Sequence, residues 1–175
     1  TLTVTDNAHP NAMGNTIAGF FFLYQQGADK EVASVEVDED ETAVTRNATV
    51  AKLKRKGDRY VSFRYQPHSI PMAVTYEFNE ASQYFEIVDE ISWENLQVAG
   101  LHPDVTYRVY MNRILVGQYK GSELAQGVNL TNLDWNPGQE AAKQMETLNQ
   151  SWHTNSSDYR AVVRQAMKGK ATQAD

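Results

Sequence analysis

The stretch Asp6-Asn7-Ala8-His9-Pro10-Asn11 stands directly before an apolar segment, and the two together predict a loop that leads into a helix. Pro10 suits the first helical position, where the missing N–H costs nothing. An acid three residues before a histidine can fold back in such a loop so that its carboxylate accepts a hydrogen bond from the Nδ1–H, which leaves Nε2 as a base. We therefore take Asp6 and His9 as candidate catalytic residues.

The apolar segment that follows has the period of an amphipathic helix. Apolar side chains recur at three- and four-residue spacing from Met13 to Tyr24, and Gly27 suits the position just past a helix end. Phe22 and Leu23 widen the stripe, so the predicted helix is apolar on most sides. Such a helix needs a partner layer, either the β segment that follows or a domain outside this chain.

From about residue 31 to residue 120 the hydrophobic period changes to two, which predicts seven or eight strands separated by turns. The predicted strands lie at residues 32–37, 50–53, 60–65, 72–78, 84–88, 96–98, 105–111 and 115–119. Short turns such as Lys56-Gly57-Asp58 and Met111-Asn112-Arg113 separate them, as in an antiparallel sandwich or meander.

The remaining residues predict a helical tail. Ser122 is the expected N-cap of a short helix over residues 123–126, and residues 128–138 are expected to form a loop. Two further helices are predicted over residues 140–152 and 158–167, with a polar break at 153–157 between them. The fold class is therefore α+β, in three parts: residues 1–27, 28–120 and 121–175.

Composition excludes several classes of function. The chain has 175 residues, a net charge of −6 and no cysteine, so nucleic-acid binding, disulfides and thiolate metal sites are not expected. Its most hydrophobic run, residues 17–24, is too short to span a bilayer, and any export signal for the periplasm or for secretion would lie upstream. His68 and His102 have no second ligand at metal spacing, so we expect neither a metal nor a cofactor.

Asp6-x-x-His9-Pro10, followed by Asn11, Gly14 and a hydrophobic helix, resembles the last conserved block of the SGNH or GDSL-type serine hydrolases. The downstream elements Gly100-Leu101, Tyr107-Arg108-Val109 and Gly117, with the segment 123–130, are similar to a strand-rich appendage and helical tail in some bacterial members of that superfamily. The resemblance implies that residues 1–27 are the terminal strand, catalytic loop and helix of an SGNH domain, residues 28–120 an antiparallel β-sandwich-like domain, and residues 121–175 a helical tail.

The same resemblance implies transfer of an ester's acyl group to a serine and then to water, with His9 as base and Asp6 as its orienting acid. The substrate would be an acylated carbohydrate or a lipid ester. The family's Gly-Asp-Ser block and its oxyanion donors have no counterpart here; Gly121-Ser122-Glu123 is the nearest string and suits a helix N-cap better. The chain is therefore expected to be the C-terminal part of an ester hydrolase, inactive alone, whose partner is the N-terminal catalytic portion of the same protein.

Three alternatives remain open. Asp6 or Asn7 could form an Asx-turn and His9 could cap the helix without any chemistry. The chain could instead be a noncatalytic β-sandwich module that binds carbohydrate or protein. Alternatively, the serine-bearing half could be cleaved off and remain associated.

Overall fold

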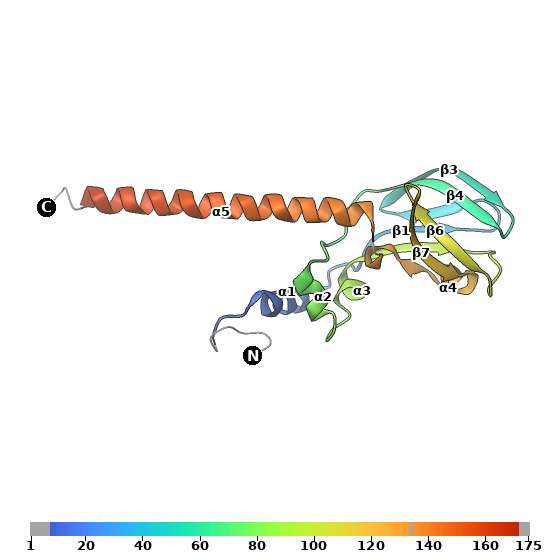
Figure 1. Cartoon of the computed structure of the whole chain (residues 1–175), viewed down its shortest axis with the longest axis horizontal. Coiled ribbons are helices and arrows are strands. Elements are labelled where there is room, and N and C mark those ends of the chain that lie inside the picture. The colour runs from blue at the N-terminus through green and yellow to red at the C-terminus, as the bar shows by residue number, and fades with distance from the viewer. Residues whose placement is uncertain (1–7, 134, 172–175) are drawn as a thin grey trace.

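The computed structural model describes residues 8–133 and 135–171, which form a strand-rich body, a small helical cluster beside it and one long helix. Figure 1 shows the strands at one end of the molecule, helices α1, α2 and α3 together below, and helix α5 extending away from both. The structure thus confirms the coarse expectation of a mixed helix and strand fold with a helical C-terminal segment. Among the described residues, no helix has both the length and the apolar character to cross a membrane.

Helix α1 (Ala12–Gln25) forms in the predicted segment and is closed by side-chain and backbone caps, but it begins two residues later than expected, so Pro10 precedes the N-cap and is not the first helical residue. Asn11 is the N-cap, and its Oδ1 accepts a hydrogen bond from the Gly14 N–H at 2.8 Å. At the other end Gly27 has a φ of +66°, and the Ala28 N–H bonds back to the Leu23 carbonyl. This is the Schellman arrangement, which favours glycine at the left-handed position.

The described strands form three sheets instead of one antiparallel sandwich. The main sheet has the order β2-β1-β5-β8, and two hairpins, β3-β4 and β6-β7, stand beside it. The strands are β1 (Glu31–Val37), β2 (Ala43–Arg46), β3 (Ala48–Lys56), β4 (Tyr60–Pro67), β5 (Trp93–Val98), β6 (Thr106–Met111), β7 (Ile114–Lys120) and β8 (Val128–Asn129). Strands β1 and β5 pair in parallel, so the prediction of an antiparallel domain is wrong for the centre of the main sheet.

The segment between β4 and β5 corrects the prediction further, because it holds two short helices where strands were expected at 72–78 and 84–88. Thr75 caps α2 (Tyr76–Ala81) by accepting from the Phe78 N–H, while α3 (Ile87–Ile91) buries Ile87, Val88 and Ile91. Parallel strands require a long crossover connection, and these helices form part of the one that joins β1 to β5.

The C-terminal segment also differs from the prediction. Helix α4 (Gly121–Gln126) begins after Lys120, not at Ser122, and a 3₁₀ turn (Leu130–Asn132) follows β8. Helix α5 (Pro137–Ala171) runs unbroken through the expected break at 153–157. The hydroxyls of Ser151 and Thr154 donate to carbonyls four residues earlier, so these polar residues are satisfied inside the helix.

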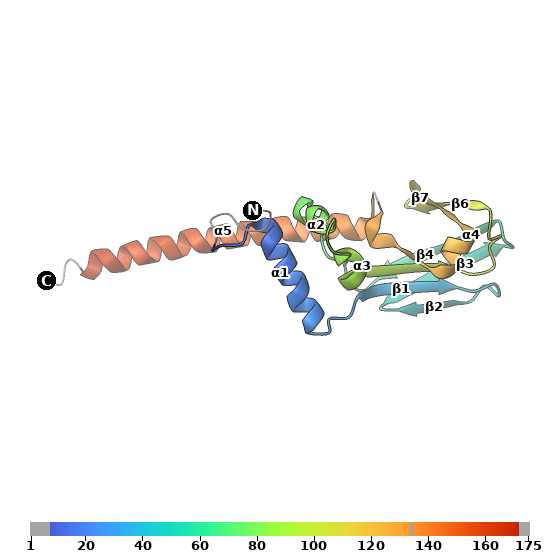
Figure 2. The same cartoon turned by 90° about the horizontal axis from the view of Figure 1, so that it is seen from below.

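Two separate apolar cores hold the described residues together. The larger core joins the main sheet to α4 and the hairpins, and its buried members are Val35, Val37, Leu96, Val98, Leu124, Val128 and Leu130. The smaller joins α1 to α2 and α3 through Met13, Phe20, Ala81, Ile87 and Ile91. Helix α1 therefore packs on helices α2 and α3, which lie within the segment that follows but are helical where the sequence analysis expected strands. Figure 2 shows the helical cluster and the strands as neighbouring groups.

Candidate functional site

His9 is exposed and lies two residues before the N-cap of α1. Asn11, not His9, caps the helix, so the capping role considered for the histidine belongs to another residue. Asp6 lies outside the described residues. The structure thus places one of the two candidate catalytic residues, exposed, at the entrance to helix α1.

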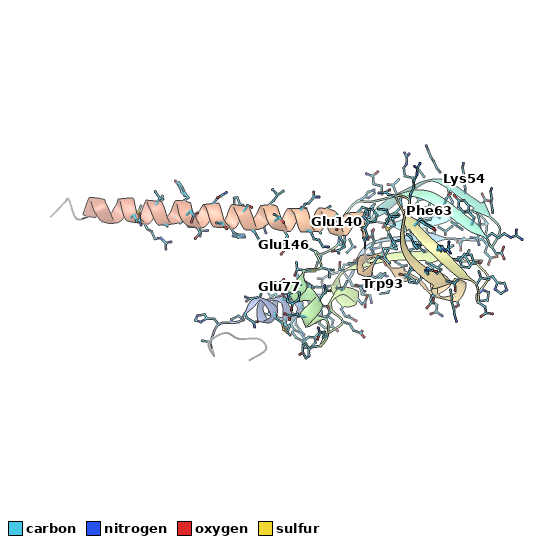
Figure 3. All side chains as sticks on the ribbon, in the orientation of Figure 1. Lys54, Phe63, Glu77, Trp93, Glu140 and Glu146 are labelled. Atoms are coloured by element: carbon cyan, nitrogen blue, oxygen red, sulfur yellow. The ribbon has the colours of Figure 1, made fainter. Side chains whose placement is uncertain are left out.

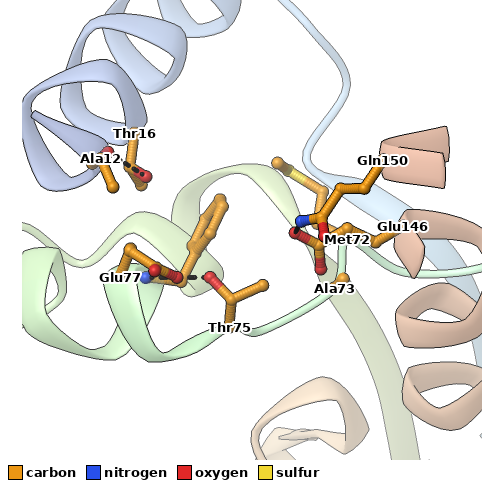
Figure 4. A pocket seen from close by; sticks show the side chains of 9 residues that line it. Ala12, Thr16, Met72, Ala73, Thr75, Glu77, Glu146 and Gln150 are labelled. Carbon is orange, nitrogen blue, oxygen red and sulfur yellow. Dashed lines mark hydrogen bonds between the residues drawn. The ribbon is translucent and has the colours of Figure 1, made fainter. Parts of the chain in front are cut away.

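A hollow of about 400 Å³ opens beside the first turns of α1, and Ala12, three residues after His9, lies at its rim. Figure 4 shows the hollow between α1, α2 and the first half of α5. Its lining residues are Ala12, Thr16, Met72, Ala73, Thr75, Glu77, Phe78, Glu146 and Gln150. Threonines, two carboxyl groups and an amide stand among the apolar groups, so this hollow offers both apolar contact and hydrogen-bond acceptors.

The acidic side chains of the hollow are held in place by local contacts. Hydrogen bonds from its own backbone N–H and from Thr75 lower the pKa of Glu77, in the first turn of α2. On α5, Gln150 Nε2 donates to Glu146 Oε1 at 3.3 Å. In Figure 3 Glu77 and Glu146 lie on facing elements of the molecule. Glu77 remains ionised at neutral pH, which makes this wall of the hollow negative.

The string Gly121-Ser122-Glu123 has a structural role. The Lys120 N–H donates to Glu123 Oε2 at 2.6 Å, and the Ser122 N–H donates to the Pro103 carbonyl at 3.1 Å. A Cβ on Gly121 would overlap the carbonyl oxygen of His102, so the close approach of two chain segments requires glycine there. Helix α4 lies among the strands, away from α1, and Ser122 is not positioned to be the nucleophile for His9 (Figure 1).

The remaining histidines and acids form no metal centre within the described residues, where no group of three or more His, Cys, Asp or Glu side chains could hold an ion. His68 Nε2 lies 2.8 Å from the Thr49 hydroxyl, which links the end of β4 to β3. His68 is therefore occupied by a local contact between neighbouring strands.

A buried polar network was not predicted from the sequence. Glu94 on β5 is 2% exposed, and its Oε2 accepts from Asn136 Nδ2 at 2.9 Å. Asn136 also donates to the Leu130 carbonyl at 2.8 Å, and its Oδ1 accepts from the Gly138 N–H at 2.6 Å. Burial raises the pKa of Glu94, and burial with the neighbouring Glu94 carboxylate raises the pKa of Tyr65.

A second amide, Asn129, extends this network. Its Oδ1 accepts from the N–H groups of Glu94 and Thr131, and its Nδ2 donates to Asp89 at 2.9 Å. Within the main sheet the network fastens strand β8 to strand β5, and it attaches the start of α5 to β5. Because its groups are enclosed, it serves to hold the fold and is not accessible to a substrate.

Comparison with known proteins gives one structural likeness. No family model matches the chain, and no curated protein matches it. The solved structure of BT4096, a gut microbial diltiazem-metabolizing enzyme, is similar with a TM-score of 0.73 and 26% sequence identity. The likeness covers 86% of this chain and 36% of that one, so the chain spans little more than a third of the length of that enzyme. This protein therefore shares its fold with part of an enzyme.

Proposed function

We propose that this chain is the C-terminal part of an SGNH-type serine ester hydrolase, in which His9 is the general base and Asp6 orients it. The observation that carries the proposal is the Asp6-x-x-His9-Pro10 block, with an exposed His9 directly before the capped helix α1. The likeness to part of a diltiazem-metabolizing enzyme supports it, because diltiazem contains an acetate ester, a bond of the class that such hydrolases cleave.

In the proposed reaction, a serine from the upstream part of the polypeptide supplies the nucleophile. His9 Nε2 takes the Oγ proton as Oγ attacks the ester carbonyl, and the imidazolium then gives that proton to the leaving alkoxide. Asp6 accepts a hydrogen bond from the Nδ1–H of His9, remains ionised and stabilises the imidazolium. Water then attacks the acyl-serine, with His9 again as the base, and the acid product leaves.

We assign the hollow beside the first turns of α1 to the alcohol portion of the substrate. Glu77 and Glu146 are half-buried acids in its wall, and its remaining lining combines four apolar residues with two threonines and a glutamine. This arrangement suits an ester whose alcohol portion carries a basic nitrogen or several hydroxyls. Acylated carbohydrates, lipid esters and acetate esters that carry a basic nitrogen, such as diltiazem, are the substrates to compare.

The test is ester hydrolysis by the polypeptide encoded by the complete reading frame. We expect His9→Asn to lower kcat/KM for p-nitrophenyl acetate by on the order of 10³-fold or more, since it removes the base. His102→Asn, at an exposed histidine in a turn of the strand-rich body, is the matched control and should leave kcat/KM unchanged. Equal activity of the His9 variant and the wild type contradicts the proposal.

The noncatalytic alternative makes the opposite forecast. A binding module for carbohydrate or protein has no serine block upstream and no esterase activity at any length of polypeptide. An inactive complete reading frame without a Gly-Asp-Ser turn would favour that function.

A further inference from the structure

Helix α5 carries a line of exposed apolar side chains, here called the α5 stripe, formed by Met145, Leu148, Trp152, Tyr159 and Val162. Each of the five is between 59% and 71% exposed. Figures 1 and 2 both show the C-terminal half of α5 extending beyond the remaining elements, and Figure 3 shows this half surrounded by open space. Large apolar residues on a solvated helix indicate a surface that another element covers.

The α5 stripe faces away from the rest of the molecule. Glu146 and Gln150 line the hollow beside α1 and α2, so their side of the helix faces the helical cluster. At 3.6 residues per turn, the stripe lies on roughly the opposite side. The fold of this chain therefore leaves the stripe uncovered, and a partner can reach it without displacing α1 or α2.

The spacing of the α5 stripe selects a helix as that partner. Its members recur at intervals of three, four, seven and three residues, which is the a and d pattern of a coiled coil with Asn155 at the one intervening d position. A shallow, open depression lies at this point, lined by Trp152, Asn155, Ser156, Tyr159 and Arg160. A side chain of a second helix can pack against it between the two aromatic rings.

The area available is sufficient for a dimer. A fully buried Trp or Tyr removes about 150–250 Å² from water. Two copies contribute four such rings, each more than half exposed, or about 500 Å² in total, and the six aliphatic side chains add a similar amount by the same reasoning. The sum approaches the ~1,000 Å² that distinguishes a specific interface from a chance contact.

We propose that the α5 stripe is the interface between two copies of this chain, which pair through antiparallel α5 helices. In this arrangement Met145 faces Val162 of the second copy, Leu148 faces Tyr159, and Trp152 faces Asn155, so a larger and a smaller side chain meet in most layers. Charge favours the same orientation, because Glu140, beside the stripe, lies in the first half of the helix and Arg160, also beside it, lies in the second. A parallel pair would bring the arginines of both copies together.

The mass of the protein in solution tests the pairing. Sedimentation equilibrium of the chain at about 10–100 µM should give the mass of a dimer, whereas Leu148→Glu and Tyr159→Glu should each give a monomer with unchanged circular dichroism. Val44→Glu is the matched control, since Val44 is an equally exposed apolar residue on β2, and it should remain dimeric. A monomeric wild type, or a dimer that survives both α5 substitutions, overturns the proposal.

The orientation has its own test because the chain contains no cysteine. The double variant Leu148→Cys with Tyr159→Cys should oxidise to a covalent dimer, while Leu148→Cys alone should not. The two sites are about three helical turns apart within one copy, so they cannot close a disulfide intramolecularly. A covalent dimer formed by the single variant would overturn the antiparallel arrangement. Neither experiment depends on the proposed hydrolase activity.

Discussion

The His9 region and the Glu94 network place titratable groups in opposite environments. His9 is exposed at the entrance to α1, on the side of the smaller core. Glu94 is enclosed against the main sheet, with an amide from the start of α5 on its carboxylate. An enclosed carboxyl group that is hydrogen-bonded from within contributes to folding, whereas an exposed imidazole can be reached by a ligand. The comparison teaches that accessibility, not the presence of acids and bases, separates the candidate site from the scaffold.

Asn136→Ala should produce the largest loss of stability in this comparison. It removes the N-cap contact to Gly138 and leaves Glu94 Oε2 and the Leu130 carbonyl without their donor. We expect the free energy of unfolding in urea to fall by roughly 2–3 kcal/mol. His9→Ala is the reference substitution and should change it by less than about 0.5 kcal/mol. An equal loss for the two variants would remove the distinction between scaffold and site.

Gly121→Ala should lower the free energy of unfolding somewhat less than Asn136→Ala does. The added Cβ overlaps the His102 carbonyl oxygen, so the turn before β6 or the start of α4 must shift. We expect a destabilisation of about 1–3 kcal/mol, measured as a lower urea midpoint. An unchanged midpoint would show that this contact is loose and would reopen a role for the adjacent Ser122.

The pH dependence of stability sharpens the account of Glu94. Burial raises its pKa above the ordinary value of 4.5, so the folded state binds the proton more tightly than the unfolded state. The contribution of Glu94 to stability is therefore complete below pH 4.5 and declines as pH rises through the folded pKa. Glu94→Gln removes this dependence, so the stability of wild type relative to the variant should decrease between pH 4.5 and 7.5. A constant or increasing difference in urea titrations at those pH values would place the carboxyl group in a polar, solvated setting.

Gly19→Ala should change stability the least of these variants, and it should increase stability. Gly19 lies inside α1, and nothing lies within 4 Å of the position its Cβ would occupy. Alanine is the better helix former, so we expect the helical cluster to gain about 0.5–1 kcal/mol, seen as a higher melting temperature. Destabilisation would indicate that another part of the molecule approaches α1 at this point.

The sequence predicts those parts of the fold that depend on local signals. Helix α1 has an N-cap in Asn11 and a left-handed glycine at 27, and the β6-β7 hairpin has Asn112 and Arg113, both with positive φ, at its turn. Helices α2 and α3 were missed because they are only six and five residues long and depend on packing against α1. Short apolar runs of that length are compatible with a strand or a helix.

In the candidate site and the buried network, too, only the residue with a local signal could be predicted from the sequence. His9 could be found because its chemistry lies in a compact motif. Glu94 was overlooked because an acid in an alternating strand is usually expected on the solvated face, although it shares the parity of Leu96 and Val98 on β5. The alternation of Glu94 with Leu96 and Val98 was the one signal in the sequence that could have indicated its burial. Its buried partner Asn136 comes from 42 residues later, which no local pattern indicates.

The most direct test of the proposed catalytic role is labelling by a fluorophosphonate probe, which reacts with an activated serine. In the polypeptide encoded by the complete reading frame, we predict that one serine upstream of Thr1 is labelled, that His9→Asn abolishes labelling, and that Asp6→Asn slows it strongly. The chain 1–175 alone should remain unlabelled. Labelling of the His9 variant at the wild-type rate, or no labelling of the complete polypeptide, would contradict the assignment of His9 as the base.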